Sequence, residues 1–423
     1  MHLNPFTPSE IASSPDDFFG RSQELNALER SLQLGSVAIQ GAIGIGKSSL
    51  LARARLMMEG FDSNHSARSV VAVGDKDIQT IDQAARLLLE SFVRIDERQK
   101  KVKFQLKGLF EVESAEIVRN FTEGRHLAVL KRVVEKDYLE RMLDDRELLI
   151  LAVDEADKCP APLARLFRSV ITHTQQQGVK QVRFVFCGVS PFYQDMVQED
   201  PGISRFIYKT ITLQPMAQHE AADLIHTKLA LVAADAEKRG IRLAIDPQIP
   251  ERVLDLSGGH PHIIQLLGSH LIENECEDPD AIIDSADLVK SLRRICYDDR
   301  ARVYDTTIHT LELYGMLDPF LTLLGLMSPG FPSRVSRRKA QKDVRQEEIQ
   351  WLAERNIIST WSPDEYGLVD EFLRIRFMLD AAESATDEKS VELYLLERQE
   401  EVEDRERFVR YADDPFYDEE ESG

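Results

Sequence analysis

The sequence predicts an α/β protein in which a parallel sheet is followed by a helical domain and a winged-helix domain. Three observations support this fold class. Short apolar strands alternate with amphipathic helices up to residue 215, the strand signal then disappears, and a helix–helix–hairpin order follows after residue 304. The chain has 423 residues, 43% apolar and 30% charged, which suits two or three domains and excludes collagen-like or wholly disordered chains.

The first region, residues 1–215, is expected to fold as a parallel sheet covered on both faces. Helices are expected over 80–93 and 126–143, where apolar residues recur three and four positions apart. Residues 101–117 alternate apolar and polar side chains around Gly108, which favours an inserted β-hairpin or an irregular loop. The expected strands are 36–40, 69–73, 148–153, 182–186 and 207–213.

Residues 216–303 are expected to form a small helical lid domain, because Pro and Gly separate four helical patterns. These patterns cover 218–238, 248–256, 262–275 and 285–296.

Residues 304–384 predict a winged-helix domain. Helix 319–327, a Pro/Gly turn, a basic stretch and helix 343–356 precede two apolar segments that flank a turn at 362–365. This is the element order of a winged helix.

The formal charge of −21 excludes a protein whose whole surface wraps nucleic acid, because phosphate binding needs a basic footprint. Residues 380–423 hold 17 acidic and 5 basic residues. We therefore expect 385–423 to be an acidic, disordered tail that either solubilises the chain or binds a partner. No targeting or membrane segment is visible, and we expect a cytoplasmic protein with free thiols at Cys159, Cys187, Cys276 and Cys296.

A phosphate-binding loop is predicted between strand 36–40 and the next helix. GAIGIGKS at 41–48 fits G-x-x-x-x-G-K-[ST], in which glycines and a helix N-terminus bring backbone N–H groups to phosphates. Lys47 is expected to reach the β- and γ-phosphates and Ser48 to ligate Mg²⁺. The residues assigned to nucleotide binding here are Gly41, Ala42, Ile43, Gly44, Ile45, Gly46, Lys47, Ser48 and Ser49.

Strand 148–153 leads into two carboxylates, Asp154 and Glu155. Asp154 is expected to act on Mg²⁺ or on water bound to it, because this ion requires hard oxygen ligands. Glu155 is expected to polarise the attacking water as a general base. Together with the phosphate loop, these carboxylates predict a P-loop NTPase.

Residues 17–25, DFFGRSQEL, resemble the F-x-G-R-x-x-E-L segment that precedes the phosphate loop in AAA+ and STAND ATPases of the origin-recognition-like, archaeal-ATPase branch. In that family the segment lines the adenine pocket, which implies ATP and assigns Phe19, Gly20 and Arg21 to nucleotide binding. Read without the family, the segment is an amphipathic helix start with Ser22 as N-cap.

Two further segments resemble parts of the same family's catalytic site. FVFCGVS at 184–190 resembles the sensor-1 strand, which implies contact of Ser190 with the γ-phosphate or the attacking water; Ser190 could equally cap the next helix. SRFIYK at 204–209 resembles the position of an arginine finger supplied to a neighbouring subunit. Arg205 is the candidate, with Arg165 and Arg168 as rivals.

SGGHPH at 257–262 resembles the G-G-H-P module of the family's lid, which implies nucleotide contact by His260 and Pro261. Locally, the two glycines end one helix and the proline begins another. The winged-helix region, 304–384, holds a concentrated basic stretch, which could contact DNA phosphates, dock a protein or receive the acidic tail. Its cations are Arg334, Arg337, Arg338, Lys339, Lys342 and Arg345.

The resemblance implies an ATP-hydrolysing AAA+/STAND switch that uses ATP/ADP and Mg²⁺. Its nucleotide state would control assembly with a protein partner, either as a homo-oligomer or with a separately encoded effector, in a regulatory, defence or signalling role. The alternative is a DNA-associated ATPase similar to initiator or transposition regulators, with the winged helix on DNA. Neither function involves a membrane.

Overall fold

The computed structural model describes residues 4–60, 66–98, 124–143, 145–189, 192–277, 282–327, 333–355 and 357–381. They belong to two units, one made of residues 10–214 and the other of residues 1–9 together with the chain from 215 onward. The expected hairpin at 101–117, Ser190 and the acidic tail at 385–423 lie outside the described residues.

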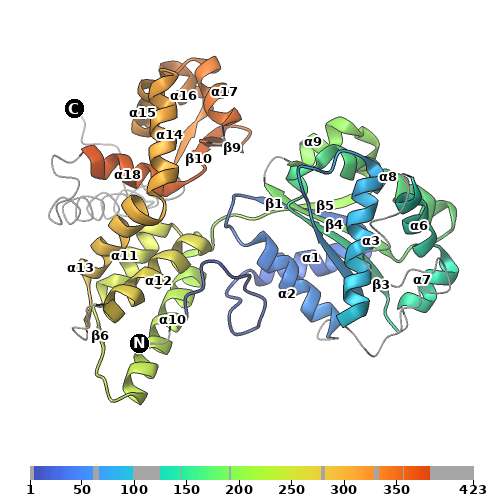
Figure 1. Cartoon of the computed structure of the whole chain (residues 1–423), viewed down its shortest axis with the longest axis horizontal. Helices are drawn as coiled ribbons and strands as arrows, with labels where there is room; N and C mark the ends of the chain where they lie inside the picture. The colour runs from blue at the N-terminus through green and yellow to red at the C-terminus, as the bar shows by residue number, and fades with distance from the viewer. Residues whose placement is uncertain are drawn as a thin grey trace, which may run out of the picture. The chain divides into compact units, whose positions relative to one another are not determined.

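The unit of residues 10–214 contains the expected parallel sheet, which confirms the predicted fold class (Figure 1). Its five strands lie in the order β2-β3-β4-β1-β5, and every neighbouring pair is parallel. All carboxyl ends therefore meet at one edge, where loops after parallel strands build ligand sites. The strands are β1 (Ser36–Gly41), β2 (Ala67–Val73), β3 (Leu148–Asp154), β4 (Val182–Val189) and β5 (Ile207–Thr212).

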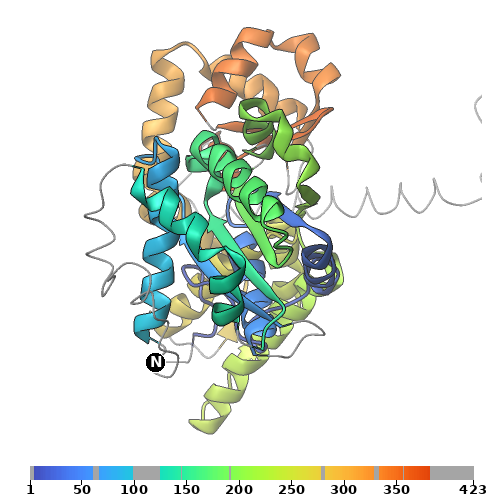
Figure 2. The ribbon, with the colours of Figure 1, turned by 90° about the vertical axis from the view of Figure 1, so that its right-hand side faces the viewer.

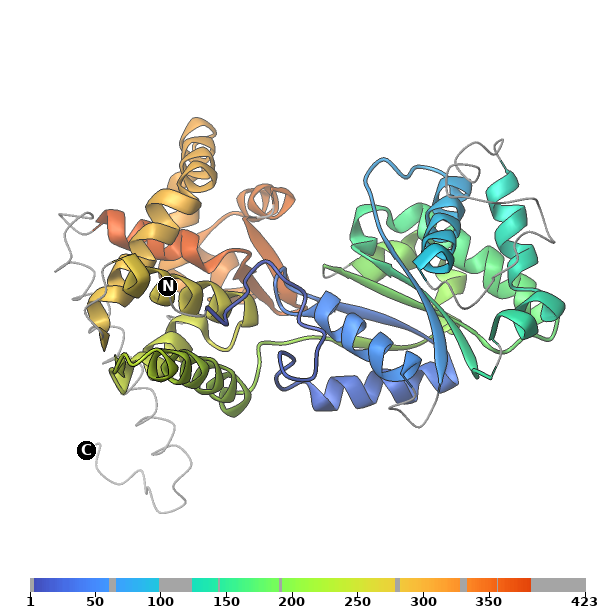
Figure 3. The ribbon, with the colours of Figure 1, turned by 60° about the horizontal axis from the view of Figure 1, so that its bottom comes forward.

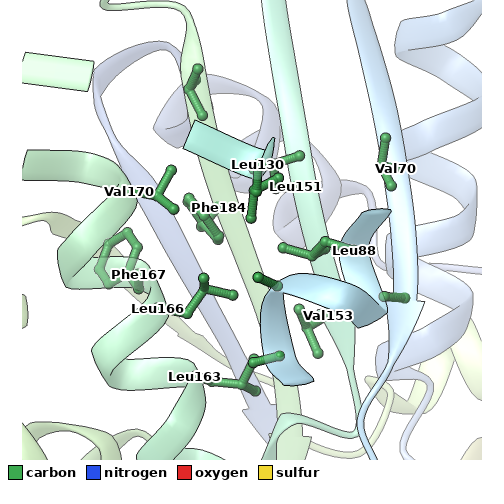
Figure 4. Close-up of a cluster of buried hydrophobic side chains, with 14 of the residues drawn as sticks. Val70, Leu88, Leu130, Leu151, Val153, Leu163, Leu166, Phe167, Val170 and Phe184 are labelled. Atoms are coloured by element: carbon green, nitrogen blue, oxygen red, sulfur yellow. The ribbon is translucent and has the colours of Figure 1, made fainter. Parts of the chain in front are cut away.

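Helices cover both faces of this sheet, because the strands are apolar on both sides. Along β3, Leu149, Leu151 and Val153 pack on one face. Figure 4 shows Leu151 and Val153 together with Leu163, Leu166 and Phe167 of a covering helix. The residues between them along β3 pack on the other face. Helices α3 (Ile81–Arg98), α6 (Arg125–Val133) and α8 (Pro160–Gln176) cover the first face (Figure 2), and α1 (Ser22–Leu34) and α2 (Lys47–Glu59) the second.

The single helix expected over 126–143 is wrong: α6 ends at Val133, and α7 (Lys136–Leu143) begins after a break. The Glu135 N–H bonds to Arg132 O instead of continuing the α-helical pattern. The pair of β-branched valines at 133–134 has low helix propensity, which favours a break there. Apolar periodicity continues through both helices and so did not reveal it. Short elements η1 (Ala156–Lys158), α9 (Phe192–Glu199) and η2 (Pro201–Arg205) complete the unit.

The second unit begins with helices, and residues 4–8 pack against them (Figure 3). The helix expected over 285–296 is α-helical only to Arg293 and continues as a π-helix, η3 (Arg294–Asp299). The expectation of no strands in the lid is also wrong, because β6 (Ala244–Ile245) pairs with β7 (Ile282–Ile283). The helices are α10 (Gln218–Lys238), α11 (Gln248–Ser257), α12 (Pro261–Glu277), α13 (Ser285–Arg293) and α14 (Ala301–Leu313).

The C-terminal part of this unit has a three-stranded antiparallel sheet, ordered β8-β10-β9. The basic stretch is itself structured as a strand and a helix, and the helix expected over 343–356 is shortened because Val344 adopts an extended conformation. The elements are α15 (Leu317–Leu326), β8 (Arg334–Ser336), α16 (Arg337–Asp343), α17 (Gln346–Glu354), β9 (Ile358–Ser362), β10 (Glu365–Leu368) and α18 (Glu371–Ala381). None of the helices described here is long and apolar enough to cross a bilayer.

Candidate functional site

The loop between β1 and α2 has the backbone that its glycines suggest. Gly44 and Gly46 have φ angles of 74° and 99°, a region that favours glycine. A Cβ on Gly41 would lie 2.9 Å from Leu213 O. The first turn of α2 has no side-chain cap and no acidic residue, so its N–H groups and positive dipole end face the loop. These features fit an anionic phosphate group.

Lys47 lies inside this loop. Its Nζ donates to Gly41 O at 3.1 Å and to Ala42 O at 2.7 Å. Burial lowers the pKa of the Lys47 ammonium, and the nearby charges of Asp157, Asp154 and Glu155 oppose that shift. The structure thus brings the phosphate loop and the carboxylates after β3 into one electrostatic site. Among the described residues, Lys47 forms no ion pair.

The turn after β3 is tight and strained. Asp154 Oδ1 accepts the Glu155 N–H at 3.0 Å, and Glu155 has a φ of 52°, an uncommon angle for a residue with a side chain. Gly74 donates to Asp154 O at 2.7 Å, and a Cβ there would lie 2.4 Å from Glu155 O. The backbone therefore holds Glu155 with its carboxylate exposed, where it pairs with Lys158.

Asp157 is a site residue that the sequence reasoning missed. Its Oδ1 accepts the Val189 N–H at 2.9 Å and so connects the turn after β3 to the end of β4. It is also the acidic group with the largest effect on the Lys47 pKa. The signal was present, because a third carboxylate follows Asp154 and Glu155 in DEAD at 154–157.

The segment before α1 contacts the phosphate loop through Arg21. This residue is buried, has a φ of 60°, and donates from Nη2 to Ile45 O at 3.2 Å. Its Nη1 donates to Glu24 Oε1 at 2.9 Å. Phe19 and Gly20 precede it and are partly buried. The structure therefore joins this segment to the loop, and its contact with adenine remains a prediction.

The three candidate finger arginines differ in their surroundings. Arg205 is exposed at the end of η2 and stacks on Phe206, with 4.8 Å from Cζ to the ring centroid. Arg168 stacks on the same ring at 5.5 Å and is partly buried. Arg165 donates from Nε to Glu199 at 2.7 Å. Within the described residues neither Arg205 nor Arg168 has a carboxylate partner, and Arg205 is the more exposed of the two.

His260 and Pro261 lie in the second unit, and their local roles are clear. Gly258, with a φ of 54°, caps α11, and Pro261 is the first residue of α12. Gly259 O accepts the Met216 N–H at 2.9 Å, and a Cβ on Gly259 would lie 2.5 Å from Met216 O. Contact of His260 and Pro261 with nucleotide remains a prediction.

Most cations of the basic stretch are used within the C-terminal part. Arg334 pairs with Glu365 at 3.6 Å, and Arg345 forms an ion pair with Glu348. Arg337 lies over the Tyr366 ring at 4.9 Å from its centroid. Lys339 Nζ donates to Leu326 O at 3.2 Å. Only Arg338 and Lys342, both exposed on α16, have no partner within the described part of the chain.

The described residues contain no cluster of three or more His, Cys, Asp or Glu side chains that could hold a metal. Mg²⁺ in nucleotide sites commonly uses one or two protein oxygens together with phosphates and water. Ser48, after the loop, and Asp154, at the carboxyl end of β3, are compatible with that requirement.

Comparison with known proteins gives a family and a fold. The family model described as "Novel STAND NTPase 1" matches residues 3–267. No relative was found among curated proteins. A Walker-type ATPase of Pyrococcus abyssi is similar in structure, with a TM-score of 0.53, 15% identity, and coverage of 87% of this chain and 98% of that one. The Aeropyrum pernix ORC2 protein, in ADPNP and ADP complexes, has a TM-score of 0.53, 14% identity, and coverage of 88% and 98%.

Proposed function

The chain belongs to the Novel STAND NTPase 1 family, and from this premise we propose that it is an ATP-hydrolysing switch whose nucleotide state controls assembly with a protein partner. The observation that carries the proposal is the placement of the Lys47 ammonium among the loop carbonyls, within the field of three carboxylates. A partly buried cation in that position favours a polyphosphate, and the carboxylate of Glu155 favours hydrolysis.

Each residue has a separate role in this proposal. Lys47 and the loop N–H groups bind the phosphates, while Ser48 and Asp154 hold Mg²⁺, which neutralises phosphate charge when bound. Glu155 accepts the proton of the attacking water. Asp157 is a positioning residue that ties the turn carrying Glu155 to β4, and Ser190 follows at the end of that strand. His260 and Pro261 contact the nucleotide from the lid.

Arg205 is the residue that links nucleotide state to assembly in this proposal. Its exposure and its support by the Phe206 ring suit a guanidinium that reaches a neighbouring subunit's nucleotide. ATP and ADP then favour different assemblies, because only the triphosphate offers a γ-phosphate to this residue. The partner is a second copy of the chain or a separately encoded effector.

Arg205→Ala is expected to lower turnover about 10³-fold or more, the range known for arginine fingers, and to leave ATP affinity unchanged. Turnover should return when this variant is mixed with Lys47→Ala, since each supplies what the other lacks. Steady-state phosphate release and calorimetry measure the two quantities. Arg141→Ala, which removes an exposed arginine lying over the Tyr138 ring at 6.0 Å from its centroid, is the matched control. Mixed variants that stay inactive would exclude Arg205 as a finger acting between subunits and would point to Arg165, to Arg168 or to a monomeric enzyme.

A DNA-associated role is the second candidate, and the exposed pair Arg338 and Lys342 is the observation that favours it. They lie four residues apart and hence on one face of α16. Phosphate contacts contribute a slope of about −0.9 each to log K against log salt, so two free cations give about −2 and all six about −5. We expect filter binding to duplex DNA to be weak, with the shallower slope. A slope of about −5 would instead support the DNA-associated role and contradict the protein-partnered switch.

A further inference from the structure

We propose that residues 294–300 form a joint that transmits nucleotide state from the lid to the C-terminal sheet and α18, with His262 as the positioning residue that sets Arg300. This inference rests on the proposed switch function and goes beyond it, because it names the residues that connect the lid to the C-terminal sheet and α18. All contacts that carry it lie within one unit, that of residues 1–9 and 215 onward.

His262 makes two directional contacts. Its Nδ1 lies 3.1 Å from Pro8 O, and its Nε2 lies 3.1 Å from Arg300 Nη2. A carbonyl can only accept and a guanidinium can only donate, so the ring is neutral, with the proton on Nδ1. Burial and the Arg300 charge lower the His262 pKa, which favours the neutral ring, and the two partners select the tautomer. The ring therefore orients the Arg300 guanidinium rather than repelling it.

The oriented Arg300 guanidinium bonds to the C-terminal part of the unit. Its Nη1 donates to Asp370 Oδ2 at 2.7 Å, and the Tyr304 hydroxyl donates to the same oxygen at 3.2 Å. Asp370 Oδ1 accepts the Phe372 N–H at 3.0 Å, at the start of α18. A change at Arg300 therefore acts on the carboxylate that caps this helix.

The joint itself has an uncommon backbone. Residues 294–299 form a π-helix between α13 and α14, a rare conformation that is frequent at functional sites. Its side chains and carbonyls hold α18 at two more points. Arg376 Nη1 donates to Cys296 O at 2.9 Å, and the Tyr297 hydroxyl donates to Asp380 at 2.9 Å. The π-helix thus connects α13 to α14 along the chain and also contacts α18.

Two segments of this unit are joined directly to His262. One is the chain itself, because His260 and Pro261 directly precede it. The other is the N-terminal strap, residues 4–8, which lies on α10 and α12 (Figure 3). Lys228 Nζ donates to Pro5 O at 2.6 Å, and Phe6 fills the space that a Cβ on Gly268 would need, 2.3 Å from its Cε1.

Single contacts with partly exposed charges stabilise a fold little. We therefore assign these contacts the role of positioning side chains, not of stabilising the fold.

The test is hydrogen exchange of the full-length chain with ADPNP or ADP, each with Mg²⁺. Peptides from 365–381 are expected to differ in protection between the two nucleotides. His262→Ala should reduce that difference at least about fivefold, the lower range of allosteric coupling, without changing nucleotide affinity by calorimetry. His262→Gln, which can still donate and accept, should restore it. His309→Ala, an exposed histidine on α14, is the matched control.

Asp370→Asn tests the output side independently and should have the same effect, which covers the case in which His262→Ala does not fold. An unchanged nucleotide difference in both variants overturns the inference. The inference is also overturned if the unmutated chain shows no difference in protection although calorimetry shows that both nucleotides bind. That result leaves the proposed ATP hydrolysis untouched. Failure of either nucleotide to bind overturns the proposed function and this inference together.

Discussion

Replacing Lys47 with alanine is expected to lower affinity for ATP by at least about 10²-fold, because breaking a buried charge pair costs about 3–5 kcal/mol. In the structure the ammonium is held by the carbonyls of Gly41 and Ala42 and by no carboxylate among the described residues. A phosphate would be the counter-ion that this cation lacks. Isothermal calorimetry with ATP measures the loss.

The burial of Lys47 also leads to a second expectation: removing its charge should not lower the stability of the unliganded fold. Because the folded-state pKa of Lys47 is lowered, the charged side chain destabilises the unliganded fold at neutral pH. Lys47→Met, which removes the charge and keeps the apolar stem, should unfold thermally at the same temperature as the unmutated chain or higher, without nucleotide. Lys76→Ala, an exposed lysine of the same unit, controls for charge alone and should change neither quantity. Unchanged ATP affinity in Lys47→Ala would refute the phosphate-loop assignment.

The strands and the phosphate loop could be predicted because their signals are local. Strand β3 is a continuous apolar run, and the loop at 41–46 needs glycines for its own backbone. Each can be read within ten residues of sequence. The resemblance of 17–25 assigned Arg21 to nucleotide binding, and the structure adds its contact with Ile45 of the loop, which no local pattern contains.

The residues that were missed act through partners far along the chain. Asp157 bonds to Val189, and His262 meets Arg300 and, through it, Asp370. Sequence spacing gives no distance between such positions. The π-helix after α13 was missed for a different reason, because buried residues such as Ile295 and Cys296 continue the apolar pattern whether the backbone is α or π. In the basic stretch, composition counted the charges and could not show that most of them have internal partners.

Replacing Glu155 with glutamine is expected to lower ATP turnover about 10²- to 10⁴-fold, the contribution of a positioned general base. ATP affinity should stay close to that of the unmutated chain, because Lys47 and the loop N–H groups are untouched. Glutamine keeps the length of the side chain and an oxygen that can accept from Lys158. Single-turnover phosphate release and calorimetry separate the two effects.

The backbone at Glu155 makes this substitution informative. A φ of 52° costs conformational energy at a non-glycine residue, and Gly74 and Asp154 hold the turn that imposes it. Such strain is retained where it places a functional side chain, and glutamine accepts the same backbone. Glu140→Gln, on the exposed side of α7, should leave turnover unchanged. If Glu155→Gln hydrolyses ATP at the unmutated rate, the carboxylate is not the base, and the exposed Glu155–Lys158 pair is then only a surface contact.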